Sequence, residues 1–126
     1  MDPMEKARQQ TLAILQTIQS AGDLRDREEE LLDSFEEIFK TAVKSVKAFS
    51  DSRASLSPTE MMAGLERFQD EHFLFGPAFE KETTRIDNLP DTADAIASFQ
   101  QKLDARTNPL LAEYMALLDR LVNEFL

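Results

Sequence analysis

The stretch LLDSFEEIFKTAVKSVKAF, residues 31–49, decides the fold class of this chain. Its apolar residues recur at alternating intervals of three and four, which keeps them on one face of an α-helix. Acidic residues precede the stretch and lysines come late in it, as the helix macrodipole favours. We therefore predict a helix over about 24–49 that packs one face against another helix. The residues of that face are Leu32, Phe35, Phe39, Ala42, Val46 and Phe49.

The residues before this helix predict a partner for it. Gly22 can take the left-handed conformation that ends a helix, and Asp23 can cap the helix that follows. We therefore expect a first helix over 3–21. Because the connection is so short, this helix has to lie antiparallel to the second one.

A third helix is predicted to start at Pro58. Ser57 can cap it, proline suits the first helical position, and Glu60 can complete a capping box. The pair Gly76-Pro77 lies inside the apolar stripe, and an interior proline removes one hydrogen bond and kinks or ends a helix. Since Phe79 and Ile86 stay in phase with the start of the stripe, we predict a kink here rather than a break. The stripe is Met61, Leu65, Phe68, His72, Phe75 and Phe79.

The last third of the chain carries two more helix patterns, over 91–106 and 109–126. Asn108 and Pro109 together suggest a new helix start between them. The sequence leaves open whether these two segments form one broken rod. Glycine is scarce and turn clusters lie far apart, so the expected fold is an all-α antiparallel bundle of four to five helices. We expect the bundle to be one domain over 1–126.

Composition and charge exclude several classes of function. A net charge of −10 would repel a phosphate backbone, and the largest basic group is only Lys40, Lys44 and Lys47. No apolar run approaches the roughly 20 residues that cross a bilayer, and the N-terminus lacks the order of a signal peptide. The absence of cysteine excludes thiolate chemistry and fits a reducing compartment. We expect an acidic cytoplasmic protein that binds neither nucleic acid nor membrane.

Metal sites and cofactors are not expected either. A di-iron bundle site needs two Glu-x-x-His pairs, but this chain has one histidine, His72, and Gln69 stands three residues before it. The acidic run Glu28-Glu29-Glu30 is interpreted as a solvated helix face. The three isolated glycines form no phosphate-binding loop. We therefore predict that the protein is not an enzyme and binds no cofactor.

The segment around the single histidine gives one alternative function. His72-Phe73-Leu74-Phe75-Gly76 resembles the motif of histidine phosphotransfer domains at His72, Leu74 and Gly76, and departs from it at Phe75, where those domains have a lysine. The resemblance implies that His72 would accept a phosphoryl group. Against this, the stripe places His72 among phenylalanines, where an imidazole would be a core residue bonded to a carbonyl, a carboxylate or Tyr114.

The leading expectation for function is protein interaction. The apolar faces are wider than one small core requires, so we expect self-association or binding of a partner helix. The expected outer contact is on the last helix, at Leu110, Leu117 and Leu121. A further alternative is a carrier for a small apolar ligand, which would have a cavity beside Phe68 and Phe79.

Overall fold

The computed structural model describes residues 2–71 and 75–125, with side chains over 2–68 and 75–124. Within these residues the chain forms six α-helices, one 3₁₀-helix and no strand, so the predicted all-α fold is confirmed. The helices outnumber the expected four to five for a definite reason. The helix predicted over 24–49 is interrupted at Arg27, and the helix predicted from Pro58 is interrupted before Pro77, while the two predicted after residue 91 form one. In order they are α1 (Pro3–Gln16), α2 (Ala21–Asp26), α3 (Glu28–Asp51), η1 (Arg53–Ser55), α4 (Pro58–Glu71), α5 (Pro77–Asp87) and α6 (Ala93–Phe125).

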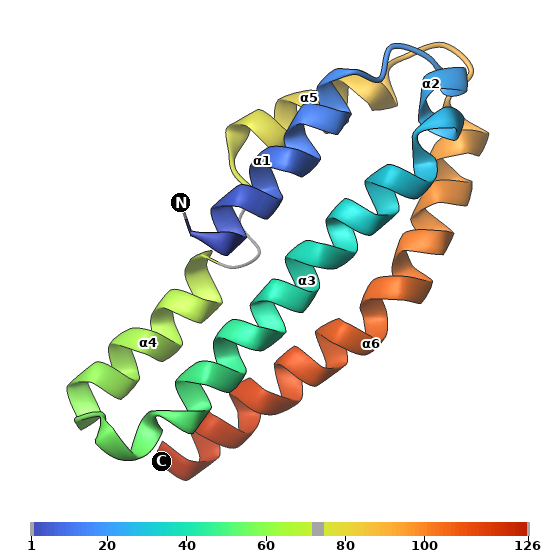
Figure 1. Cartoon of the computed structure of the whole chain (residues 1–126). Helices are drawn as coiled ribbons and strands as arrows, with labels where there is room; N and C mark the ends of the chain where they lie inside the picture. Colours follow the sequence, from blue (N-terminus) through green and yellow to red (C-terminus); the bar gives the residue numbers. More distant parts are fainter. Residues whose placement is uncertain (1, 72–74, 126) are drawn as a thin grey trace.

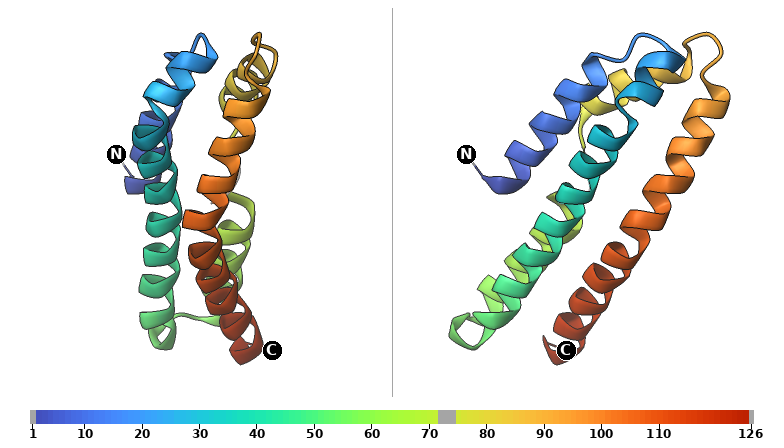
Figure 2. Two further views of the ribbon diagram at one scale, coloured as in Figure 1. Left: turned by 90° about the vertical axis from the view of Figure 1, so that its right-hand side faces the viewer. Right: turned by 45° about the vertical axis from the view of Figure 1, so that its right-hand side comes forward.

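The long helices α3 and α6 lie side by side and antiparallel along the length of the bundle (Figure 1). α1 packs along the half of α3 that follows α2. α4 packs on α6 and contacts the other half of α3 through the rings of Phe68 and Phe49. Figure 2 shows α1 on the side of α3, and α4 and α5 on the side of α6. The helices α4 and α5 therefore share one corner of the bundle, while α1 fills only half of another.

Two clusters of buried apolar side chains fill the interior. Helices α1, α3 and α6 contribute to both, and the half-buried rings of Phe35 and Phe75 pack against both. The Tyr114 cluster contains Met4, Ala7, Ile38, Ala42, Val43, Val46, Leu65, Phe68, Tyr114, Leu118 and Leu121. The Phe79 cluster contains Ile14, Leu15, Ile18, Leu24, Leu31, Phe79, Ile86 and Ala95.

The start of α4 follows the sequence prediction. The Glu60 backbone N–H donates to Ser57 Oγ at 3.2 Å, and Pro58 is the first helical residue. One turn further on, α4 comes close to α3. A methyl group on Gly64 would lie 2.3 Å from Cε2 of Phe49, so only glycine fits this approach without a shift of the ring.

The first predicted helix ends earlier than expected. α1 stops at Gln16, and the Thr17 hydroxyl donates to the Ile14 carbonyl at 2.6 Å, satisfying a carbonyl at the helix end. Ser20, not Asp23, caps α2, because Ser20 Oγ accepts from the Asp23 N–H at 3.2 Å. Gly22 therefore lies inside α2 and does not end a helix.

The kink predicted at Gly76-Pro77 is instead a break between two helices. Gly76 has φ +86°, in the left-handed region where a helix cannot continue. Pro77 is then the first residue of α5, a position that needs no N–H donor. Phe79 and Ile86 are nevertheless both buried, so the apolar stripe still faces the core after the break.

The two segments predicted after residue 91 form one continuous helix. α6 passes through Pro109, so Asn108 does not act as an N-cap. A proline in a helix interior forfeits one hydrogen bond and strains the preceding turn. The apolar residues on both sides of Pro109 pack against the same straight partner, α3, and this shared packing outweighs the local loss.

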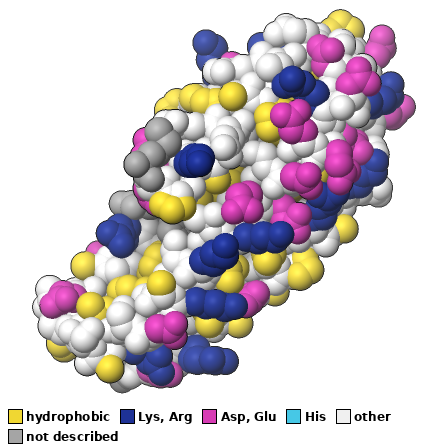
Figure 3. Space-filling view, viewed as in Figure 1, with side chains coloured by type: hydrophobic (Ala, Val, Ile, Leu, Met, Phe, Trp, Pro, Cys, Tyr) yellow, Lys and Arg dark blue, Asp and Glu magenta, His cyan; other side chains and the backbone are white. Residues whose placement is uncertain are grey.

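Ion pairs connect the first half of α3 to α6. Arg106 contacts Glu29 and Asp33, and Lys102 contacts Glu28. The hydrogen bond with Glu29, and then that with Asp33, raises the pKa of Arg106 above its ordinary value. Figure 3 shows acidic and basic side chains interleaved on this face. The acidic run at the start of α3 is therefore part of a helix-to-helix contact, beyond the solvated face that we expected.

Candidate functional site: an apolar pocket between α5 and α6

A pocket of about 520 Å³ lies between α5 and α6, with α3 contributing to its lining. It arises because α5 packs mainly on α1 while α6 packs mainly on α3, so the two helices are held apart. Its volume falls in the usual range for small-molecule sites. The apolar lining residues are Leu15, Leu24, Leu31, Phe35, Phe75, Phe79, Ile86, Ile96, Phe99 and Leu103.

Four phenylalanine rings form a connected part of this lining. Phe35 lies edge-on to Phe75, with ring centres 6.4 Å apart, and 6.1 Å from Phe99. Phe75 and Phe79 have ring centres 5.1 Å apart. The break before α5 matters here, because Phe75 immediately precedes Gly76 and so contacts α3 from the connection rather than from a helix. The rings give the pocket walls that are both apolar and polarisable.

Arg85 holds the α5 wall in place. Its guanidinium donates to the Ile18 carbonyl at 2.7 Å and to the Leu15 carbonyl at 3.0 Å, and it pairs with Glu82 at 2.8 Å. The two carbonyls lie at and just beyond the end of α1, and the Leu15 carbonyl also accepts from the Ile18 N–H at 3.2 Å. A single side chain therefore binds the end of α1 and fixes α5 beside it.

The polar lining residues are acidic or neutral, and none is basic. They are Glu80, Thr83 and Asp87 on α5 and Gln100 on α6. Gln100 donates to Asp104 Oδ1 at 2.9 Å, which orients its amide. No lysine or arginine is among the lining residues within the described part of the chain. The chemistry of the pocket is thus an apolar, partly aromatic body with carboxylates at its edge.

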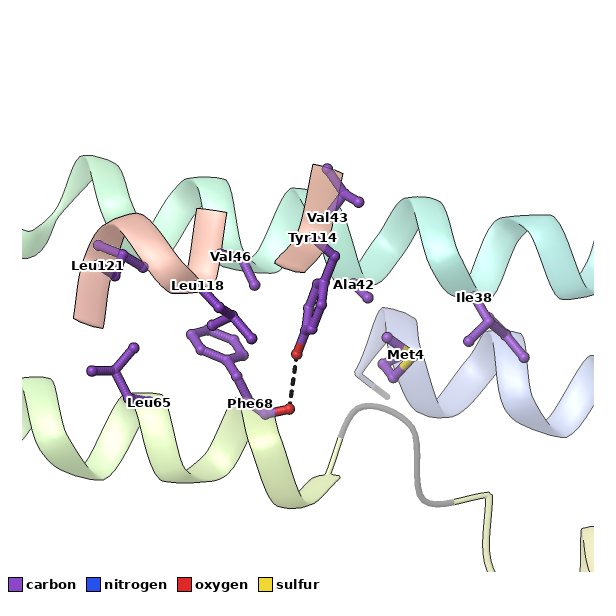
Figure 4. Close-up of a cluster of buried hydrophobic side chains, with 11 residues drawn as sticks. Met4, Ile38, Ala42, Val43, Val46, Leu65, Phe68, Tyr114, Leu118 and Leu121 are labelled. Carbon is purple, nitrogen blue, oxygen red and sulfur yellow. Dashed lines mark hydrogen bonds between the residues drawn. The ribbon is translucent and has the colours of Figure 1, made fainter. Parts of the chain in front are cut away.

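The other cluster is closed around Tyr114. Its ring is 2% exposed, and its hydroxyl donates to the Phe68 carbonyl at 2.8 Å (Figure 4). Burial raises the pKa of Tyr114 to about 12. Figure 4 shows Leu118 and Leu121 of α6 and Leu65 of α4 around these two residues. This cluster has the character of a core and not of a site.

The residues predicted as candidates from the sequence fall in three places. His72 lies outside the described residues, so its predicted role stays a prediction. Leu110 and Leu117 are half-buried against the Tyr114 cluster, and Leu121 is 1% exposed inside it. Leu121 is therefore not available as an outer contact, because the side chain is enclosed by this chain's own helices.

The predicted pair of cavity residues is split between the two clusters. Phe79 lines the pocket, whereas Phe68 belongs to the Tyr114 cluster. From the sequence, Phe35 is predicted only as part of an apolar helix stripe, and Phe99 lies in the segment predicted as a helix over 91–106. Nothing in the sequence placed them beside Phe79, because the pocket draws its residues from separate helices.

Neither metal-binding groups nor membrane spans occur in the described part of the chain. Over 2–71 and 75–125, no three histidine or acidic side chains gather closely enough to hold a metal ion. None of the helices there is both long and apolar enough to cross a bilayer. No protein-family model, curated protein or solved structure matches this chain.

Proposed function

We propose that this chain is a non-enzymatic binding protein that takes a small apolar molecule into the pocket between α5 and α6. The observation that supports this is the pocket itself, an apolar hollow of about 520 Å³ with a wall of phenylalanine rings. Its volume is in the range of small-molecule sites, and most of its lining residues are apolar. Of the functions expected from the sequence, the apolar-ligand carrier therefore has the most direct support.

The proposal is tested with N-phenyl-1-naphthylamine, a neutral dye that fluoresces strongly in apolar surroundings. The protein is expected to bind it saturably, with one dye per chain. Gln100→Trp places an indole at the edge of the pocket and is expected to raise the Kd about tenfold or more, which corresponds to about 1.4 kcal/mol. Gln101→Trp is the matched control, because Gln101 is exposed and does not line the pocket.

Two results would contradict the proposal. One is the absence of saturable dye binding by the native chain. The other is equal loss of binding, or equal retention, in the Gln100→Trp and Gln101→Trp proteins. Circular dichroism at each step shows that both variants are folded, so a loss of binding can be assigned to the pocket.

Self-association is a second candidate, and the exposed apolar residues favour it. Leu111 and Met115 lie one turn apart on α6 and are 36% and 49% exposed, and Met62 on α4 is 44% exposed. Half-buried Leu110 and Leu117 lie on the same helix. In a symmetric dimer formed through α6, each copy would cover Leu111 and Met115 of the other. The proposed partner is therefore a second copy of this chain.

Light scattering after size-exclusion chromatography tests this candidate. A dimer through α6 is expected to show twice the chain mass at high concentration and to revert to a monomer in Met115→Glu, which places a charge in the contact. Ala105→Glu adds the same charge at another exposed position of α6 and should leave the dimer intact. A monomer throughout a wide concentration range rules this candidate out.

A further inference from the structure

We propose that the pocket selects a small amphiphilic cation, such as an amine or quaternary ammonium compound with an apolar body. This inference rests on the proposed function and specifies its ligand class. It combines three observations: carboxylates lie at the pocket edge, no lysine or arginine lines the described pocket, and the wall is aromatic.

The carboxylates lie along one face of the wall. Glu80 and Asp87 are seven residues apart on α5, which puts them two turns apart on the same side, with Thr83 between them. Both side chains line the pocket and are exposed to solvent. A ligand with its apolar body inside the pocket would place its polar end at this edge.

No basic residue of the flanking helices lines the described pocket, and Lys81 on α5 is exposed outside it. On α5, Arg85 is directed to the carbonyls of α1 and to Glu82. On α6, Lys102 pairs with Glu28 and Arg106 pairs with the acidic residues of α3. None of these side chains lines the pocket. The edge of the pocket is consequently negative, and the net charge of −10 strengthens that potential.

The aromatic wall favours the same ligand. The face of a phenyl ring attracts a cation, and the attraction strengthens when the cation is partly removed from water. Phe75, Phe79, Phe35 and Phe99 all border the pocket, close to the α5 and α6 residues that form its edge. A neutral ligand would gain only the apolar contact, and an anion would be repelled by the carboxylates. The volume of about 520 Å³ falls in the range of small-molecule sites, and we therefore assign a small molecule rather than a partner's side chain.

Displacement of the naphthylamine dye by three matched compounds tests the selectivity. 2-Naphthylmethylamine is a cation, 2-naphthylmethanol is neutral and 2-naphthoate is an anion, with the same aromatic body. We expect the amine to compete about tenfold more strongly than the alcohol, as one charge-assisted contact would give, and the carboxylate to compete least. The advantage of the amine should shrink as salt is added, since the carboxylates are exposed.

A double variant and its control assign the preference to the two carboxylates. In Glu80→Gln with Asp87→Asn, the amine and the alcohol should compete equally, while the affinity for the alcohol stays unchanged. Glu66→Gln with Asp119→Asn removes the same net charge from exposed positions that do not line the pocket and should keep the preference. This control separates a local effect from the overall charge.

The outcomes distinguish this inference from the proposed function. If the dye binds but the amine, alcohol and carboxylate compete equally, or if the carboxylate competes best, the selectivity is overturned and the pocket function stands. A preference that survives in the Glu80→Gln, Asp87→Asn protein also overturns it. If the dye does not bind at all, the proposed function itself fails. Dye binding that none of the three compounds displaces overturns the assignment to a small cation and favours a partner's side chains.

Discussion

Replacing Leu121 with alanine is expected to lower the free energy of unfolding by about 2–5 kcal/mol, the usual range for a leucine truncated inside a core. The side chain is 1% exposed and belongs to the Tyr114 cluster with Leu65 and Leu118. Truncation would leave a cavity at a contact between α6 and α4 that these neighbours can close only in part. Urea unfolding followed by circular dichroism measures the loss.

The matched control lies on the same helix. Leu111→Ala makes the same chemical change at a position that is 36% exposed, and its cost should be clearly smaller, within about 1 kcal/mol. The comparison holds the helix propensity and the side chain constant, so the difference reports burial alone. Equal losses in the two variants would show that α6 presents a different face to the bundle from the one described here.

Tyr114 is expected to ionise with a pKa of about 12 in the folded protein. The cause is burial, which disfavours the charged phenolate. The chain has one tyrosine and no tryptophan, so absorbance near 295 nm follows this one group without interference. In denaturant the same titration should move to about 10, the value of an exposed tyrosine. A midpoint near 10 in the folded protein would contradict the burial of this ring.

The same shift predicts how stability depends on pH. The folded state binds the phenolic proton more tightly than the unfolded state does, so this stabilisation is complete below about pH 10. It is lost progressively as pH rises from about 10 through about 12. Tyr114→Phe lacks the ionisable group and should lack this part of the loss, although other groups titrate in both proteins. The difference between the two unfolding curves across this interval isolates the contribution of Tyr114.

The sequence predicted the helical class and the start of α4 because those signals are local. A serine cap, a proline at the first helical position and an apolar stripe act within a few residues of one another. In α3 the predicted stripe is only part of the buried surface. Leu31, Ile38 and Val43 are buried as well, because α1 and α6 pack against this helix from different sides.

The breaks between helices depended on packing that the sequence does not display. Pro77 and Pro109 are similar local signals, yet one begins a helix and the other lies inside one. The difference is tertiary. Both sides of Pro109 pack along α3, whereas Gly76 adopts a left-handed φ and lets α5 leave the line of α4 to pack on α1. The pocket forms because α5 leaves the line of α4. The sequence therefore identifies the lining residues as apolar positions but does not predict that they lie together.

The sharing of α1, α3 and α6 between the two buried clusters has a consequence for cooperativity. Neither cluster can stay folded on a segment of its own, because α1, α3 and α6 supply side chains to both clusters. Phe35 and Phe75 join the clusters directly, since each packs against both. Loss of either cluster removes the partners of the other. The molecule should therefore melt in one all-or-none transition, even though its helices are interrupted and its interior is divided.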